Sequence, residues 1–221
     1  MSQKGRGVRG LGLGNWYEET ILPKVIGLGC GGDEVTELRS KVLPLAQGSV
    51  FEIGCGGGYN QPLYRKDAIT HFAGIDPNGA LLDAARKRAA EQGWEADIRQ
   101  GVGESIPFPD GSFDTVVCTY TLCSVQDQQQ VLSEMRRILK PGGRLLYLEH
   151  GKAPDPGPAK WQRRIEPVWK KLMGNCHLSR EVGGAIRHSG FEVEPIGQTY
   201  FEKAPKWAGW MEWGAARRVG P

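Results

Sequence analysis

The chain has 221 residues, of which 39% are hydrophobic and 24% charged, and its formal net charge is +3. This length predicts one domain whose core needs neither disulfides nor a structural metal. The charge is too small to indicate a nucleic-acid partner, and the absence of any run of 18 apolar residues predicts no transmembrane helix.

The N-terminal residues differ in composition from the rest. Residues 1–14 contain five glycines and three basic residues but no apolar stretch, so we expect a disordered tail and no signal peptide. Residues 15–221 are expected to form a single domain, with a helical cap at 15–48, a core at 49–150, and a lid with closing strands at 151–218. The five cysteines form no C-x-x-C pair, which favours a reducing, cytoplasmic location and predicts no metal site.

Strand and helix patterns alternate from residue 50 onwards. Apolar runs predict strands at Val50–Ile53, His71–Ile75, Ala96–Arg99, Phe113–Cys118 and Arg144–Glu149. Helical spacing predicts helices at Gly79–Gln92, capped by Asn78, and at Asp127–Leu139, ended by Pro141-Gly142-Gly143. We expect helices within 151–190 and two closing strands within 191–217. This alternation predicts an α/β fold with a parallel sheet and helices on both faces.

A glycine-rich turn follows the first strand at once. Gly54, Gly56 and Gly58 occupy every second position, and Glu52 precedes them at the same spacing. Because glycine has no Cβ, the turn can be tight and its N–H groups can approach a ligand closely. Tyr59 stands where a dinucleotide fingerprint would need glycine, which argues against a nicotinamide dehydrogenase.

This acid-x-Gly-x-Gly-x-Gly order resembles the first motif of the class I S-adenosylmethionine (SAM) methyltransferases. The resemblance implies a Rossmann-like fold with a mostly parallel, seven-stranded sheet. It also implies SAM as the methyl donor and S-adenosylhomocysteine as the product.

Four predicted strand ends carry residues suited to that cofactor. Ligands of open parallel sheets bind beyond the carboxyl ends of the strands, where Asp76 could accept ribose hydroxyls. Many relatives have an aspartate where Val102 stands, so Glu104 or a backbone carbonyl is expected to replace it at the adenine. The expected cofactor residues are Glu52, Gly54, Cys55, Gly56, Gly58, Asp76, Pro77, Gly103, Glu104, Cys118 and Thr119.

Later motifs narrow the resemblance. Val117-Cys-Thr-Tyr-Thr-Leu-Cys-Ser-Val-Gln126, Leu148-Glu-His-Gly151 and Gly174-Asn-Cys-His-Leu-Ser-Arg180 are similar to the thiol methyltransferase-like group. That group includes alkyl-thiol and hydrogen-sulfide methyltransferases of mammals, and the similarity runs from about residue 15 to 218. The animal members carry an apolar N-terminal anchor that this sequence does not show, so membrane residence is not expected. The resemblance implies S-methylation of sulfide, methanethiol or another small thiol by in-line attack.

A thiol acceptor needs little assistance, because its pKa near ~8.5 leaves a few per cent ionised at neutral pH. His150 and His177 are the candidate bases, with packing as the alternative for each. Substrate-pocket candidates are Tyr17, Cys123, Trp161, Trp169 and Cys176. Cys55, Cys118 and Cys123 are expected as small buried residues, or alternatively as ligands of a soft substrate such as an arsenical.

The segment 158–173 has an apolar stripe of Trp161, Ile165, Trp169 and Leu172 beside five basic residues. This pattern fits core packing with a solvated basic face, or a lid that makes weak contact with a membrane surface. Two other functions stay open: an N- or C-methyltransferase of a lipid head group or quinone, and a non-catalytic SAM-binding module. The expected partner is a small-molecule substrate, for a monomer or homodimer.

Overall fold

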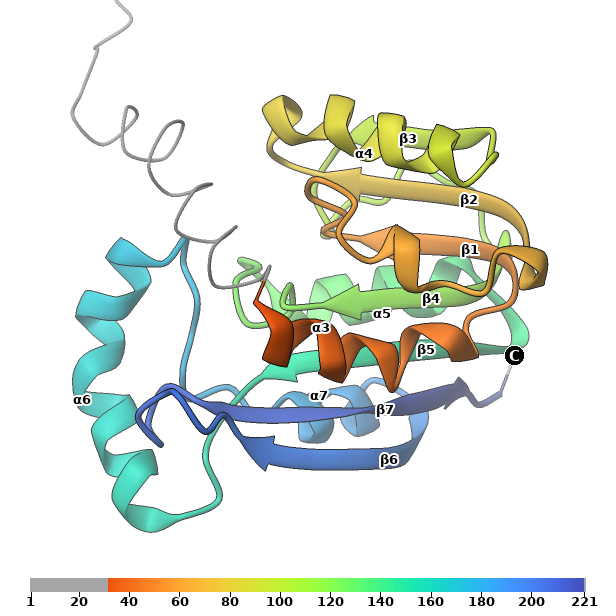
Figure 1. Ribbon diagram of the computed structural model, residues 1–221. Coiled ribbons are helices and arrows are strands. Elements are labelled where there is room, and N and C mark those ends of the chain that lie inside the picture. Colours follow the sequence, from red (N-terminus) through yellow and green to blue (C-terminus); the bar gives the residue numbers. More distant parts are fainter. Residues whose placement is uncertain (1–31, 221) are drawn as a thin grey trace, which may run out of the picture.

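The computed structural model of the protein describes residues 32–220. Seven strands in this part of the chain form one sheet in the order β3-β2-β1-β4-β5-β7-β6 (Figure 1). The strands are β1 (Gly48–Ile53), β2 (Ile69–Asp76), β3 (Ala96–Gln100), β4 (Phe113–Thr119), β5 (Leu139–His150), β6 (Phe191–Tyr200) and β7 (Trp210–Arg218). β1 to β5 are parallel, and β7 pairs antiparallel with both β5 and β6. The expected mostly parallel, Rossmann-like sheet is confirmed.

The order of the strands reverses at β1. β2 and β3 extend the sheet on one side of it, whereas β4 and β5 extend it on the other. Ile53, at the end of β1, is opposite Ile75 of β2 and Cys118 of β4, so the three strands end at the same edge of the sheet. Open α/β sheets bind ligands at such a switch point.

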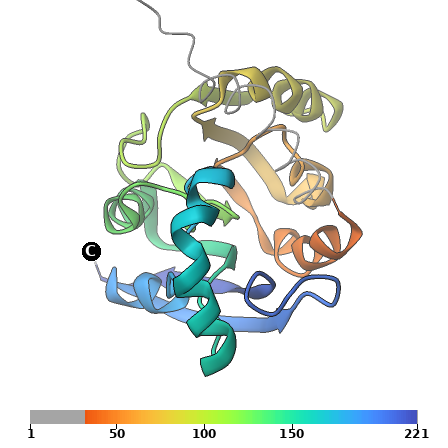
Figure 2. The ribbon, with the colours of Figure 1, turned by 90° about the vertical axis from the view of Figure 1, so that its left-hand side faces the viewer.

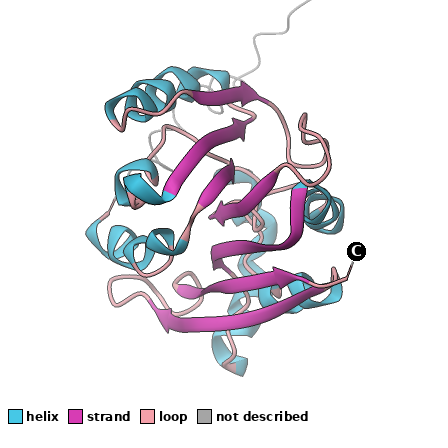
Figure 3. Ribbon diagram, turned by 90° about the vertical axis from the view of Figure 1, so that its right-hand side faces the viewer, coloured by secondary structure: helices cyan, strands magenta, loops and turns pink. Residues whose placement is uncertain are grey.

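Helices cover both faces of the sheet (Figure 3). They are α3 (Asp33–Ser40), α4 (Gly79–Glu91), α5 (Gln128–Ile138), α6 (Pro156–Leu172) and α7 (Val182–His188). Phe51 and Ile53 pack in a buried cluster with α5 and α7, whereas Val50 and Phe72 pack in a second cluster with α3 and α4. Successive side chains of a strand point to opposite faces, so alternate residues serve the two clusters.

The start of β5 differs from the prediction. The strand begins at Leu139, which pairs with Phe113 of β4, rather than at Arg144. Leu139 has extended backbone angles and therefore ends α5 itself, before Pro141-Gly142-Gly143 is reached. The register between β4 and β5 shifts between Phe113 and Thr115, as at a β-bulge. Such an irregularity allows a proline, here Pro141, within a paired strand.

α6 is separate from the two helical layers. In Figure 2 it passes in front of the carboxyl ends of the strands. None of the helices within residues 32–220 has the length and apolar character that a bilayer span needs. The predicted tail at 1–14, Tyr17 and the first part of the predicted cap lie outside the described residues.

Candidate active site

A cleft of about 1310 Å³ opens at the carboxyl ends of β1, β2 and β4. Its lining comes from the turn after β1, the end of β2, the segment after β3, the loop after β4 and the end of α6. The cleft therefore lies at the switch point of the sheet, where the sequence places its candidate residues.

The glycine turn requires glycine for two physical reasons. Gly54, Gly56 and Gly58 all have positive φ angles, of 68°, 48° and 80°. A Cβ on Gly54 would also lie 2.1 Å from Oγ1 of Thr121, and one on Gly58 would lie 3.0 Å from Cα of Ala85 in α4. Of the three, only Gly56, which lines the cleft, has room for a Cβ. Gly54 and Gly58 are needed for close packing of the turn against its neighbours.

Asp76 is fixed at the end of β2 with its carboxylate in the cleft wall. One oxygen accepts the N–H of Gly56 at 2.9 Å, and the other accepts the N–H of Asn78 at 2.8 Å. Burial raises the pKa of Asp76, and these two hydrogen bonds oppose the increase. Each carboxylate oxygen keeps a lone pair for a ligand donor.

Glu52 lies beneath the turn and supports it. Its two oxygens accept hydrogen bonds from Nδ2 of Asn60 at 2.9 Å and from the hydroxyl of Tyr64 at 2.8 Å. Asn60 Nδ2 also donates to Oγ1 of Thr119 at 2.9 Å, which joins the ends of β1 and β4. Burial raises the pKa of Glu52 to about 7, against the lowering effects of the Tyr64 hydroxyl and the charge of Arg39. Both oxygens of Glu52 are thus engaged within the protein.

The cleft presents acceptors that fit the expected cofactor. Asn60 is 2% exposed, and its Oδ1 has no hydrogen-bond partner among the described residues. Buried polar atoms rarely remain unpaired, so Oδ1 is suited to a donor group on a ligand. SAM offers two such donors, its ribose hydroxyls and its ammonium group, and Asp76 and Asn60 would hold them.

The segment after β3 approaches the cleft closely. A Cβ on Gly103 would lie 2.6 Å from Cδ1 of Ile53, so a larger residue here would force the Ile53 side chain to move. Oε1 of Glu104 accepts the backbone N–H groups of Gln126 and Asp127 at 2.9 and 3.2 Å. Val102 is 49% exposed and also lines the cleft, so the adenine contact of Glu104 remains a prediction.

Comparison with known proteins identifies the family. A model of the methyltransferase domain matches residues 51–147. The chain is 38% identical to the thiol S-methyltransferase TMT1B of Rattus norvegicus over 148 residues, which are 65% of this chain and 59% of that protein. It is 34% identical to the human TMT1B over 186 residues, 80% of this chain and 73% of that protein. The chain belongs to the SAM-dependent methyltransferases.

The solved structures agree on the fold. A SAM-dependent methyltransferase of Thermotoga maritima, described as a possible histamine N-methyltransferase, superposes with a TM-score of 0.69 over 93% of this chain and 99% of its own. Its sequence identity is 21%, so this likeness shows the fold alone. Family and fold together establish SAM as the cofactor of this methyltransferase and S-adenosylhomocysteine as its product. The chain spans about three fifths of the length of the rat relative.

Most of the expected cofactor residues line the cleft of the methyltransferase. They are Glu52, Gly54, Cys55, Gly56, Asp76, Pro77, Gly103, Glu104 and Thr119. The lining does not include Gly58, which packs against α4, or Cys118, whose thiol donates to Oε1 of Glu149 at 3.2 Å.

Glu149 shapes the loop after β4. Its oxygens accept the backbone N–H groups of Thr121, Leu122 and Cys123 at 2.9, 3.1 and 3.3 Å. Burial raises the pKa of Glu149 to about 7, and these hydrogen bonds oppose the increase. A side chain of β5 therefore determines the form of the neighbouring loop in the methyltransferase.

The two candidate bases lie behind the cleft wall. His150 is 7% exposed, and its Nδ1 lies 3.9 Å from Sγ of Cys176. Nδ1 of His177 is 3.5 Å from Oε1 of Glu166. Burial, followed by the charges of Arg180 and Lys170, lowers the pKa of His177. Neither histidine is among the described residues that line the cleft, so their catalytic role remains a prediction.

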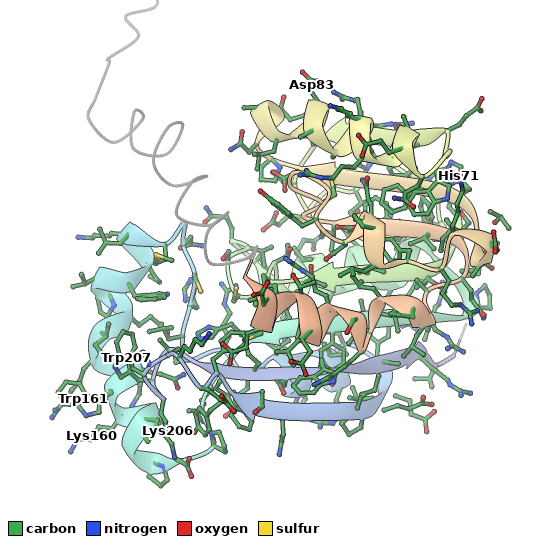
Figure 4. The ribbon with its side chains drawn as sticks, viewed as in Figure 1. His71, Asp83, Lys160, Trp161, Lys206 and Trp207 are labelled. Carbon is green, nitrogen blue, oxygen red and sulfur yellow. The ribbon has the colours of Figure 1, made fainter. Side chains whose placement is uncertain are left out.

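The described pocket candidates also lie away from the cleft lining. Trp161 is 53% exposed and points away from the sheet (Figure 4). Trp169 packs edge-on against Trp207, with ring centroids 5.6 Å apart. Cys123, in the loop after β4, and Cys176, after α6, are not part of the lining, and Tyr17 lies outside the described residues.

The apolar stripe of α6 does not form its buried face. The buried residues of α6 are Ala159 and Gln162, whereas Trp161 and Leu172 are about half exposed. Gln162 accepts the N–H of Ala153 and donates to the carbonyl of Gly151, at 2.8 and 3.0 Å. Because α6 lies beyond the ends of the strands, the described residues form no apolar core beneath it. Hydrogen bonds from the Gln162 side chain to backbone groups hold it in place instead.

Several cleft residues had no recognisable signal in the sequence. Asn60 is one, and Arg39 of α3 is another: it is 5% exposed, and its guanidinium lies 5.5 Å from the ring centroid of Tyr120. Lys170 and Lys171, at the end of α6, form part of the wall nearest the loop after β4. Nothing in the local sequence distinguishes them from the other basic residues of the same helix.

Proposed function

We propose that this methyltransferase transfers the methyl group of SAM to the sulfur of a small-molecule thiol. The observation that carries the proposal is the positive charge that the end of α6 brings to the cleft wall. Lys170 and Lys171 line the cleft, and the described lining includes no histidine. The names of the rat and human relatives support the same reaction class.

This wall suits a nucleophile that ionises by itself. A thiol with a pKa near ~8.5 is a few per cent thiolate at neutral pH, whereas a hydroxyl or carbon acid would need a strong base. An ammonium group about 4 Å from a thiolate stabilises the thiolate by about 1 kcal/mol in water. This lowers the pKa of the thiol by somewhat less than one unit. Two lysines at the wall therefore raise the thiolate fraction without accepting a proton.

The remaining residues bind and orient. When bound, SAM supplies an electrophilic methyl group on its sulfonium. Asp76 and Asn60 accept hydrogen bonds from the donor groups of the cofactor. The cofactor can approach the backbone of the turn at Gly54–Gly58 closely, because glycine has no side chain. Glu149 fixes the loop after β4, which forms the boundary between the cofactor and the acceptor wall.

The experiment that tests the proposal supplies several acceptors to the purified protein. SAM is incubated with sulfide, methanethiol, phosphatidylethanolamine vesicles or a quinol, and S-adenosylhomocysteine is measured with volatile methyl sulfides by headspace gas chromatography. We expect methanethiol or dimethyl sulfide in equal yield to S-adenosylhomocysteine. Turnover with the lipid or the quinol alone would replace the thiol proposal, and binding of SAM without turnover on any acceptor would favour a non-catalytic module.

Charge substitution tests the wall itself. The double variant Lys170→Gln/Lys171→Gln should lower kcat/KM for a thiol about three- to tenfold at pH 7 and less at pH 9, where the thiol ionises unaided. Lys160→Gln is the matched control, because Lys160 is on the same helix but points away from the sheet (Figure 4). Equal losses in the double variant and the control would contradict the role of the wall.

A further inference from the structure

Two segments meet beside the acceptor wall. The loop after β4 (residues 121–126) and the segment after α6 (residues 173–180) form a contact that we call the seam. Nδ2 of Asn175 donates to the carbonyl of Ser124 at 2.9 Å, and the N–H of His177 donates to the carbonyl of Cys123 at 2.8 Å. Ser124 and Asn175 both line the cleft, so the seam joins two parts of its wall.

Arg180 reinforces the seam. Its guanidinium donates to the carbonyls of Leu122 and Val125 at 2.6 and 2.8 Å. Glu166 of α6 holds the segment from the other side, because it accepts the N–H and the hydroxyl of Ser179 at 2.7 and 2.6 Å. The backbone of each segment is thus placed firmly against the other.

Cys123 and Cys176 face each other across the seam. The residue after Cys176 donates its N–H to the carbonyl of Cys123 at 2.8 Å, which brings the backbones next to the two cysteines together. The two thiols are close enough for each to change the pKa of the other. Cys123 is 3% exposed, whereas Cys176 is half-buried and can be reached by a small reagent.

The two thiols differ in acidity. The neighbouring thiol of Cys123 lowers the pKa of Cys176, with further lowering by His150 and the indole of Trp169, and the same interaction raises the pKa of Cys123. Nδ1 of His150 lies 3.9 Å from Sγ of Cys176. A thiolate beside a second thiol and an imidazole is the arrangement of a reactive cysteine.

The other described cysteines lack this environment. Burial raises the pKa of both Cys55 and Cys118. The thiol of Cys118 donates to the carboxylate of Glu149, a negative neighbour that further disfavours its thiolate. Reactivity is therefore concentrated at Cys176.

We propose that Cys176 and Cys123 form a reversible redox pair that reacts with low-molecular-weight disulfides. The Cys176 thiolate attacks one sulfur of the disulfide, forms a mixed disulfide and releases the first thiolate. Cys123 then loses its proton and attacks Cys176, which forms the Cys123–Cys176 disulfide and releases the second sulfur as a thiol. Two electrons pass from the two cysteines to the small disulfide, which is reduced to two thiols.

The link would act on the cleft. Covalent closure of the seam fixes residues 124–125 against residues 174–175, so this wall can no longer open. We expect oxidation to reduce the rate at which acceptors exchange and dithiothreitol to restore it. The redox pair itself does not depend on which acceptor the enzyme methylates.

The test uses glutathione disulfide on the full-length protein, followed by alkylation and non-reducing peptide mapping by mass spectrometry. The wild type should give one linked peptide pair containing Cys123 and Cys176. Cys123→Ser should stop at the first step and carry one glutathione on Cys176. Cys176→Ser should carry neither a link nor a glutathione on Cys123. Cys55→Ser is the matched control, because Cys55 is buried in the turn after β1, and it should still form the link.

Three results would overturn the proposal. They are no linked pair in the wild type, a glutathione adduct on Cys123 in Cys176→Ser, and a link that is lost in Cys55→Ser. The wild-type map decides the first of these alone, so it remains decisive even if a variant fails to fold. Iodoacetamide at pH 6 gives a second measure, because Cys176 should react at least about tenfold faster than Cys123 in the reduced protein.

Discussion

Replacement of Asp76 gives the sharpest test of the cofactor site. Asp76→Ala removes a carboxylate that is 8% exposed and that accepts the N–H groups of Gly56 and Asn78 at 2.9 and 2.8 Å. A hydrogen bond to a charged group contributes about 1.5–3 kcal/mol. If a cofactor hydroxyl donates to the same carboxylate, its loss should weaken binding by about 1–3 kcal/mol, which is roughly a 5- to 150-fold rise in Kd.

Isothermal titration with S-adenosylhomocysteine measures this change directly. Asp83→Asn is the matched control, because Asp83 of α4 is exposed (Figure 4) and forms an ion pair with the neighbouring Arg86 at 2.8 Å. We expect its Kd to stay within about twofold of the wild type. Circular dichroism of each variant confirms that the fold is retained.

The pH dependence supplies a second readout. Burial raises the pKa of Asp76, so its protonation on acidification begins at a higher pH than for an ordinary aspartate near ~3.9. Only the ionised carboxylate accepts through both oxygens, so wild-type affinity should fall as the pH is lowered through this range. Asp76→Asn should show no such fall. An unchanged Kd for a folded Asp76→Ala, or an equal loss in Asp83→Asn, would refute this account of the site.

The other predictions concern stability and the base. Burial raises the pKa of Glu149 to about 7 in the folded protein, above the value of ~4.3 in the unfolded chain. The folded state therefore favours the protonated carboxyl, and the stability that this gives is lost as the pH rises from the unfolded pKa through 7. From pH 5 to 8 the wild type should lose about 2 kcal/mol more unfolding free energy than Glu149→Gln, whereas parallel losses in urea titrations would contradict this. Gly54 and Gly142 both have a positive φ, but only a Cβ on Gly54 would lie 2.1 Å from Oγ1 of Thr121. In urea titrations, Gly54→Ala should therefore lose at least about 3 kcal/mol of unfolding free energy, and Gly142→Ala about 1 kcal/mol. Equal losses would mean that the contact relaxes. If His150 is the base, His150→Ala should lower turnover at pH 7 and less at pH 9, where the thiol ionises unaided, whereas an equal loss at both pH values would remove it from that role.

The cofactor side of the site could be predicted from the sequence because its residues are local to strand ends. Glu52, Gly54 and Gly56 follow one strand at fixed spacing, and Asp76 ends the next, so parallel pairing brings them together. Of the two residues expected at the end of β4, Thr119 lines the cleft and Cys118 does not. Side chains alternate along a strand, and therefore Cys118 faces Glu149 whereas Thr119 faces the cleft.

The acceptor side could not be predicted in the same way. The pattern of α6 gives an apolar and a basic face, but not which residues reach the cleft, because α6 lies beyond the ends of the strands, where Gln162 joins it to Gly151 and Ala153. Asn60 and Arg39 reach the cleft from segments whose position depends on tertiary packing. A buried asparagine with one unpaired oxygen has no signature in a single sequence.

The seam has a consequence for how this enzyme can change. Asn175 and Arg180 hold the loop after β4 through the carbonyls of Leu122, Ser124 and Val125. Every residue type carries a main-chain carbonyl, so the side chains of Ser124 and Val125, which line the cleft, can be substituted while the attachment persists. New acceptor preferences can therefore arise by mutation of the loop without prior loss of its conformation, which makes this wall the evolvable part of the cleft.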